Sequence, residues 1–192
     1  MKGELLLIDN EPVEITDIST SGTGCPSNSV VPTLTSDNTQ VALLFNAYRI
    51  ITTNDPAVIP RDCTIEISLA VPEGLAVGVV GIDWRGTVVA GSGAKIKFHR
   101  KYSYSGKNGR TANKQWVRPG FYNFFLEDYP LQAHYSSCKG EPLTIRIDTS
   151  ATVDGPSSLF TLRSADFESK LTLSLDVDDQ RCKKRRLDGG AT

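Results

Sequence analysis

Apolar and polar residues alternate along much of the chain with a period of two, which is the pattern of β-strands that bury one face. The clearest run is residues 63–71, Cys-Thr-Ile-Glu-Ile-Ser-Leu-Ala-Val. Residues 94–104, 143–148 and 171–177 repeat the pattern. Because no segment keeps the 3.6-residue period of a helix, these runs predict an all-β protein.

Residues 75–86, Leu-Ala-Val-Gly-Val-Val-Gly-Ile-Asp-Trp-Arg-Gly, are apolar on both faces. This pattern predicts one strand buried between two layers, with Trp84 mostly buried. Asp83 and Arg85 lie two apart and therefore share a face of an extended chain, and we expect a structural role for both. Together with Gly86, which permits a turn, these residues form the predicted core motif.

Turn signals separate the short runs, as expected for an antiparallel β-sandwich or jelly roll. The 192 residues, 39% of them hydrophobic, suffice for one domain with a real core. We place this domain at residues 13–182, after an extension at 1–12 and before a basic tail at 183–192. No run approaches the ~20 apolar residues of a membrane span. No leader peptide is recognised, so we expect that it was removed or never present.

The formal net charge of −1 conceals a segregation of charge. Residues 85–126 carry nine Lys or Arg and no acid, whereas the flanking segments 1–84 and 127–180 are acidic. This block predicts a basic interaction face, with an ordinary solvated face as the alternative. Its members are Lys95, Lys97, His99, Arg100, Lys101, Lys107, Arg110, Lys114 and Arg118. Alternation places Lys95, Lys97, His99 and Lys101 on the outer side of one strand, and Arg100 breaks the inward register.

Few residues favour catalysis or metal binding. The two histidines, His99 and His134, form no recognisable motif, and the cysteines lack the closely spaced pairs of a zinc site. We therefore expect no catalytic residue, no metal and no cofactor. Aromatic side chains could form a sugar-stacking platform, although core packing is expected for most of them. These aromatic residues are Trp84, Trp116, Tyr102, Tyr104, Phe121, Tyr122, Phe124 and Phe125.

The cysteine count favours an oxidising compartment. Cys25, Cys63, Cys138 and Cys182 are even in number and widely separated, which favours two disulfides over reduced thiols in the core. Four cysteines allow three connectivities.

Several spaced motifs resemble the domain-of-unknown-function 4360 family. They are Gly22-Thr23-Gly24-Cys25-Pro26, Ser29-Val30, Asp62-Cys63, Ile82-Asp83-Trp84-Arg85-Gly86, Cys138 and a closing strand that ends in Cys182. The resemblance covers residues 13–182 and implies a small secreted β-sandwich with four cysteines, found in fungi and bacteria, without an established activity. The basic segment after Gly91 and the tail at 183–186 depart from the family pattern. Within this framework we predict the pairs Cys25–Cys63 and Cys138–Cys182.

Two functions are compatible with these features. The first is a secreted, non-enzymatic structural or assembly protein of the extracellular surface, because basic and acidic segments on one chain are self-complementary and favour self-association. The alternative is a carbohydrate- or cell-wall-binding module, with an acidic polysaccharide as the partner. Nucleic acid is the least favoured acidic partner for a secreted chain.

Overall fold

A computed structural model describes residues 14–34, 41–53, 58–73, 75–79, 82–128, 136–137, 139–162 and 177–181. These residues form β-strands joined by turns and loops, and no helix occurs among them, which confirms the all-β prediction. The strands are β1 (Glu14–Ser21), β2 (Val30–Leu34), β3 (Val41–Phe45), β4 (Arg49–Ile51), β5 (Val58–Ala70), β6 (Leu75–Val79), β7 (Ile82–Ala90), β8 (Lys95–Tyr104), β9 (Lys107–Trp116), β10 (Gly120–Asp128), β11 (Leu143–Asp154), β12 (Leu159–Thr161) and β13 (Val177–Arg181).

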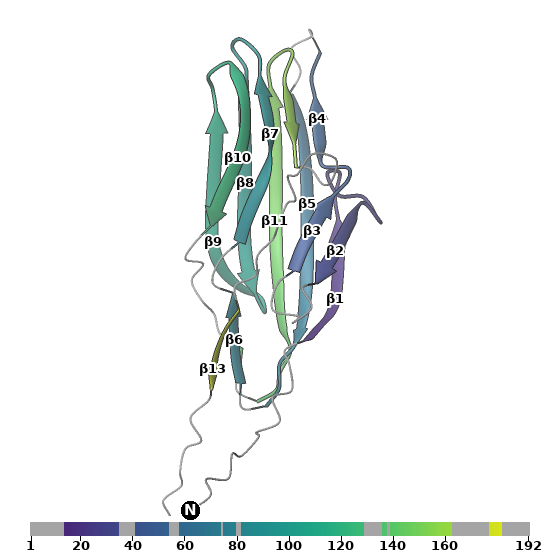
Figure 1. The fold of residues 1–192 in the computed structure, drawn as a ribbon, viewed down its shortest axis with the longest axis vertical. Helices are drawn as coiled ribbons and strands as arrows, with labels where there is room; N and C mark the ends of the chain where they lie inside the picture. Colours follow the sequence, from purple (N-terminus) through teal and green to yellow (C-terminus); the bar gives the residue numbers. More distant parts are fainter. Residues whose placement is uncertain are drawn as a thin grey trace, which may run out of the picture.

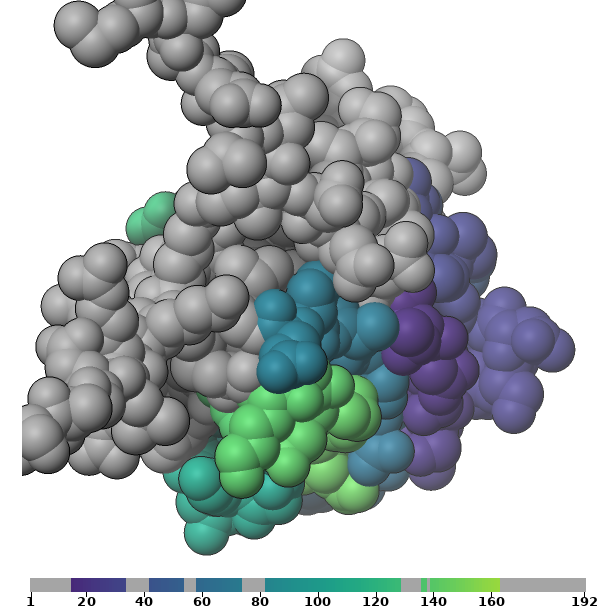
Figure 2. Space-filling model, turned by 90° about the horizontal axis from the view of Figure 1, so that it is seen from below, coloured from purple at the N-terminus to yellow at the C-terminus, as the bar shows by residue number. Residues whose placement is uncertain are grey.

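Two antiparallel sheets form the body of the fold (Figure 1). The larger has the strand order β1-β5-β11-β8-β9, and the smaller has the order β10-β7-β12-β4. Two-stranded ribbons, β2-β3 and β6-β13, accompany them. Figure 2 views the molecule along the strands. The blue residues near β5 lie between the purple N-terminal residues and the green residues near β11, as the sheet order requires. The arrangement is the predicted antiparallel sandwich.

Aromatic rings from both sheets fill the space between them. Phe98 of β8 lies 5.6 Å from Trp84 of β7 and 5.3 Å from Phe160 of β12, measured between ring centroids. Trp116 of β9 and Phe124 of β10 lie 5.1 Å apart. Trp84 is fully buried, as predicted. Because these rings come from opposite sheets, their burial is what holds the two layers together.

The prediction of one strand over residues 75–86 is wrong. The stretch contains two strands, β6 and β7, with different partners: β6 pairs with β13, whereas β7 lies between β10 and β12. The apolar positions are odd-numbered in 75–79 and even-numbered in 82–88, and such a change of parity is expected where one strand ends and another begins. Within β7 only one face is buried, and Asp83 and Arg85 share the other.

The polar residues 107–115 of β9 were not predicted to form a strand. Residues 107–115 contain no large apolar side chain, because β9 is an edge strand with little core to cover. The register with β8 also slips between Lys101 and Ser103, so both Gly109 and Arg110 fall opposite Tyr102. A bulge of this kind removes the period of two on which the prediction depends.

The family motif around Cys25 has a structural explanation. Cys25 and Cys63 form a disulfide, as predicted. The Gly24 amide donates to the Asp62 carbonyl oxygen at 2.7 Å, and a Cβ on Gly24 would lie 2.6 Å from the Tyr48 ring. Only glycine fits this close approach. Cys138, Cys182 and the predicted domain boundaries lie outside the described residues, so the second disulfide and the boundaries stay predictions.

Candidate functional site: a basic strip on the larger sheet

Four basic side chains share the outer face of the larger sheet. Lys95, Lys97, His99 and Lys101 alternate along β8 with residues that are buried in the sandwich, as predicted. We call these four residues the basic strip. Since β8 lies between β11 and β9, the strip runs along the interior of the sheet and not along an edge. At about 3.4 Å per residue the strip is about 20 Å long.

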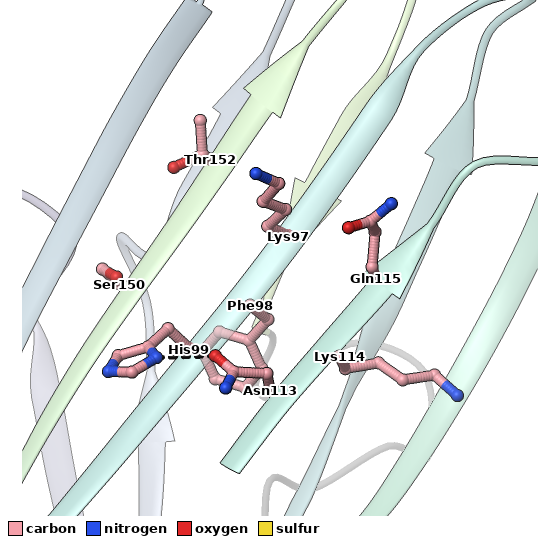
Figure 3. A pocket seen from close by; sticks show the side chains of 8 residues that line it. All are labelled: Lys97, Phe98, His99, Asn113, Lys114, Gln115, Ser150 and Thr152. Carbon is pink, nitrogen blue, oxygen red and sulfur yellow. Dashed lines mark hydrogen bonds between the residues drawn. The ribbon is translucent and has the colours of Figure 1, made fainter. Parts of the chain in front are cut away.

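An open hollow of about 430 Å³ lies over the middle of the strip (Figure 3). Its lining residues are Lys97, Phe98, His99, Asn113, Lys114, Gln115, Ser150 and Thr152. Two rows of side chains cross three strands here. Thr152, Lys97 and Gln115 form one row, and Ser150, His99 and Asn113 form the next. The His99 Nδ1 and Asn113 Oδ1 atoms share a hydrogen bond of 2.6 Å.

Carboxylates stand beside both ends of the strip. On β11, Asp154 lies opposite Lys95 and Asp148 lies opposite Lys101. Burial alone would raise the pKa of Asp148, but hydrogen bonds from Arg146 and Thr64 and the charge of Lys101 outweigh it and lower the pKa. Arg146 in turn contacts Glu66 at 2.9 Å. The lysines at the two ends of the strip therefore have acids opposite them on β11. Lys97 and His99 in the middle have neutral residues opposite them on that strand.

The other residues predicted for the basic face do not join the strip. Lys107 and Lys114 lie opposite Tyr104 and Phe98, so alternation directs them to the other side of the sheet. Figure 3 shows Lys114 projecting away from Lys97. Arg110 lies in the bulge of β9, and Arg118 follows that strand in the loop to β10. The sequence block is thus divided between two faces and a loop.

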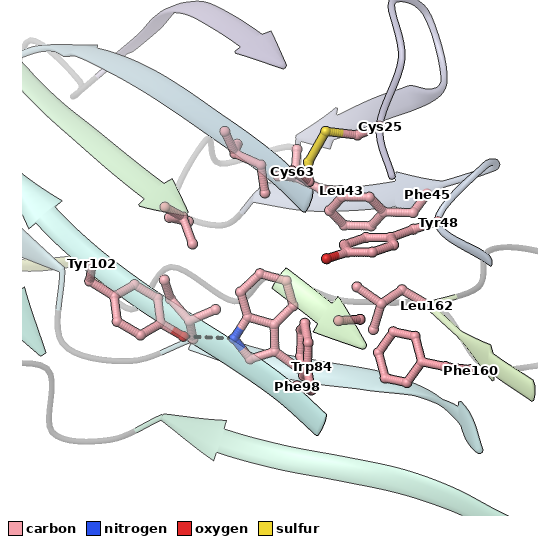
Figure 4. Close-up of a cluster of buried hydrophobic side chains, with 14 of the residues drawn as sticks. Cys25, Leu43, Phe45, Tyr48, Cys63, Trp84, Phe98, Tyr102, Phe160 and Leu162 are labelled. Atoms are coloured by element: carbon pink, nitrogen blue, oxygen red, sulfur yellow. Dashed lines mark hydrogen bonds between the residues drawn. A yellow bond between two sulfur atoms is a disulfide. The ribbon is translucent and has the colours of Figure 1, made fainter. Parts of the chain in front are cut away.

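Arg100 is a correction to the predicted basic face, because it is buried between the sheets with 3% of its side chain exposed. Its Nε and Nη2 atoms donate to the Asp128 carboxylate at 2.6 and 2.9 Å. The Tyr102 hydroxyl donates to the same carboxylate and accepts from Trp84 Nε1 at 2.8 Å (Figure 4). Burial and the Asp128 charge raise the pKa of Tyr102. This network is closed to solvent and supports the core.

Asp128 was missed at the sequence level, although a signal exists. Phe124, Leu126 and Asp128 follow one another on the inward register of β10, just as Phe98, Arg100 and Tyr102 do on β8. Two inward charges of opposite sign on neighbouring segments predict a buried pair.

Within the described ranges, no group of three His, Cys, Asp or Glu side chains is placed to hold a metal ion.

A second surface lies on the outer face of the smaller sheet. Phe121, Val89, Leu159 and Ile51 form one row across all four strands, which we call the apolar stripe. Phe121 is 66% exposed and Ile51 is 48% exposed. Beside the stripe, the Arg85 guanidinium lies 4.7 Å from the centre of the Phe125 ring.

The aromatic residues considered for a sugar-stacking platform differ in their burial. Trp84, Trp116, Tyr102, Tyr104 and Phe124 are buried, as expected for core packing. Tyr122 is half-buried, and Phe121 and Phe125 are exposed.

Among the described residues, no helix is long and apolar enough to cross a bilayer.

The family model described as "Domain of unknown function (DUF4360)" matches residues 11–182. The chain belongs to this family. An uncharacterized secreted protein of Arthroderma benhamiae is 27% identical to this DUF4360 chain over 125 residues, which are 62% of the chain and 50% of the relative. The match thus spans about half the length of that curated relative.

A comparison of structures matches TmCBM61 in complex with beta-1,4-galactotriose. The match covers 88% of this chain and 90% of that chain, with 16% identity. Its TM-score is 0.27, which is too low to support a common fold or a common ligand.

Proposed function

We propose that the protein is a secreted, non-catalytic domain that binds an acidic polysaccharide on its basic strip. Secretion is supported by the relative from Arthroderma benhamiae, which is named a secreted protein, and by the disulfide between Cys25 and Cys63. Stable disulfides are typical of oxidising compartments.

The observation that carries the proposal is the composition of the hollow. Small-molecule sites of ~300–1,000 Å³ are mostly lined by apolar side chains. This hollow is instead lined by the Lys97 and His99 side chains between hydroxyl and amide groups. Within the described part of the chain, no hydrogen bond or ion pair engages the Lys97 ammonium. A cation beside neutral hydrogen-bonding groups suits a ligand with both acidic groups and hydroxyls, which is an acidic glycan.

Binding to an acidic polysaccharide, measured by isothermal titration calorimetry with polygalacturonate, tests the proposal. Lys97→Glu should abolish binding, because it reverses the charge in the middle of the hollow. Lys107→Glu is the matched control, since it makes the same charge change on the other side of the sheet. Equal losses in both variants would indicate a general charge effect and would refute a site at the hollow.

Self-association is a second candidate, favoured by the apolar stripe. A two-fold axis parallel to the strands would place Phe121 over Ile51 and Val89 over Leu159 of a second copy, so the stripe would meet itself in an isologous, apolar contact. Exposed ion pairs contribute only ~0.2–1 kcal/mol each, so an assembly held by charged faces also needs such apolar contacts.

Light scattering at increasing concentration measures this association. Phe121→Ser should keep the protein monomeric, whereas Val117→Ser, which removes an exposed apolar side chain outside the stripe, should not. A wild-type protein that stays monomeric at high concentration in both low and high salt rules out this function.

A further inference from the structure

We infer that the basic strip selects glycans whose acidic units are isolated among neutral ones, and that Asp148 and Asp154 exclude densely charged polymers. This inference rests on the proposed function and specifies its ligand. It follows from the order of charges across the strip, which has acids opposite its lysines at both ends and neutral residues opposite its middle.

The register between β8 and β11 sets this order. Residues directly opposite one another in an antiparallel pair have Cβ atoms about 4.5–5.5 Å apart. Asp154 is therefore close to Lys95, and Asp148 is close to Lys101. The charge of Lys101 contributes to the lowered pKa of Asp148, which indicates that the two groups interact. Lys97 and His99 have Thr152 and Ser150 opposite them instead.

Pairing each charge with its direct neighbours leaves Lys97, at the centre, without a carboxylate opposite it. Lys95 and Asp154 cancel at one end. At the other end, Lys101 and Arg146 are cancelled by Asp148 and Glu66, which Arg146 joins through contacts of 3.0 and 2.9 Å. The remaining cation is Lys97, with His99 about 7 Å along the strand. Asp62 of β5 lies opposite Ser150, two strands from His99, and accepts a hydrogen bond from Thr23.

The neutral side chains around Lys97 suit hydroxylated neighbours of an acidic sugar. Gln115 and Asn113 flank the strip on β9, and Thr152 and Ser150 flank it on β11. Each offers a hydrogen-bond donor and an acceptor without a net charge. An acidic unit at Lys97 therefore has hydrogen-bonding groups for its neighbours on both sides.

A dense polyanion also meets the carboxylates at the two ends of the strip, which offset the attraction of Lys95 and Lys101. Asp148 and Asp154 are six residues apart on β11, which is about 20 Å. A nucleic acid strand carries one charge about every 3.4 Å, so any strand that follows β8 must bring phosphates close to both carboxylates. Like-charge contacts of this kind exclude wrong partners.

Two polymers with the same backbone provide the test. A partly methyl-esterified polygalacturonate carries isolated carboxylates, and the fully de-esterified polymer of equal length carries one on every unit. By calorimetry, the wild-type protein should bind the partly esterified polymer more tightly. Asp154→Asn should raise affinity for the de-esterified polymer by up to about fivefold. Asp154 is exposed, so the fold should not change. Asp148→Asn should act in the same direction.

Asp17→Asn on β1 is the matched control, because it removes the same charge from an exposed position three strands away. It should leave the preference unchanged. If the wild-type protein binds the de-esterified polymer or a single-stranded oligonucleotide as tightly as the partly esterified polymer, the inference is wrong while the proposed function stands. If it binds no acidic polysaccharide, both fail.

Discussion

Replacing Asp128 by Asn tests the role of the buried network around Arg100. Both charged side chains are 3% exposed, so water cannot replace the lost partner of the guanidinium. The substitution keeps the shape of the side chain and removes its charge. Breaking a buried ion pair on one side costs about 3–5 kcal/mol, and we expect the lower end because the Asn carbonyl still accepts one hydrogen bond.

This loss is large compared with the ~5–15 kcal/mol that stabilises a typical domain. Urea unfolding followed by tryptophan fluorescence measures it, since Trp84 and Trp116 both lie in the core. Glu127→Gln is the control, because the neighbouring residue on β10 is exposed and should change stability by less than ~0.5 kcal/mol.

A double variant, Arg100→Met with Asp128→Leu, tests whether the core needs the ion pair itself or only side chains that fill the same buried space. Apolar residues of similar size often replace a buried ion pair without loss. Here Tyr102 would keep its bond from Trp84 but lose its acceptor, and a buried donor without an acceptor costs about 1–3 kcal/mol. We therefore expect the double variant to be more stable than Asp128→Asn. A cost below ~1 kcal/mol for Asp128→Asn would refute the reasoning, since it would mean that Arg100 has no need of this partner.

Three further predictions concern the core and the disulfides. Trp84→Ala should cost about 3–5 kcal/mol through lost burial and a cavity, and a near-normal melting temperature would contradict the packing described here. Replacing Cys25 and Cys63 by Ser should lower the free energy of unfolding by at most roughly 4 kcal/mol, because the disulfide closes a loop with a sequence separation of 38. Peptide mapping without reduction should find Cys138 linked to Cys182. A peptide that joins Cys25 to Cys138 would disprove the pairing.

Strands that bury one face were predictable where apolar and polar residues alternate with a regular period of two. The runs at 63–71 and 143–148 correspond to β5 and to β11, the central strand of the larger sheet. β5 begins earlier than predicted, at Val58, because pairing with β11 extends beyond the apolar run. Pairing between strands is a long-range property, so the sequence pattern places the start of a strand less well than its core.

The candidate site was predictable in part. Alternation alone places Lys95, Lys97, His99 and Lys101 on one face. Their neighbours depend on the register with β9 and β11, which no local pattern reveals. For this reason the acids beside the strip and the hollow were not expected. Alternation also places Arg100 on the inward side of β8, so its membership of the predicted basic face was wrong.

The disulfide between Cys25 and Cys63 determines how the molecule responds to force. β1 is an edge strand, paired with β5 from Glu14↔Ala70 to Ser21↔Thr64. Tension applied at residue 14 would open these pairs one after another, because an edge strand has a neighbour on only one side. Cys25 follows the last pair, so peeling stops there and the load passes through the sulfur atoms into β5, which is held on its other side by β11. The chain can thus lengthen by one short strand while the rest of the sandwich stays closed.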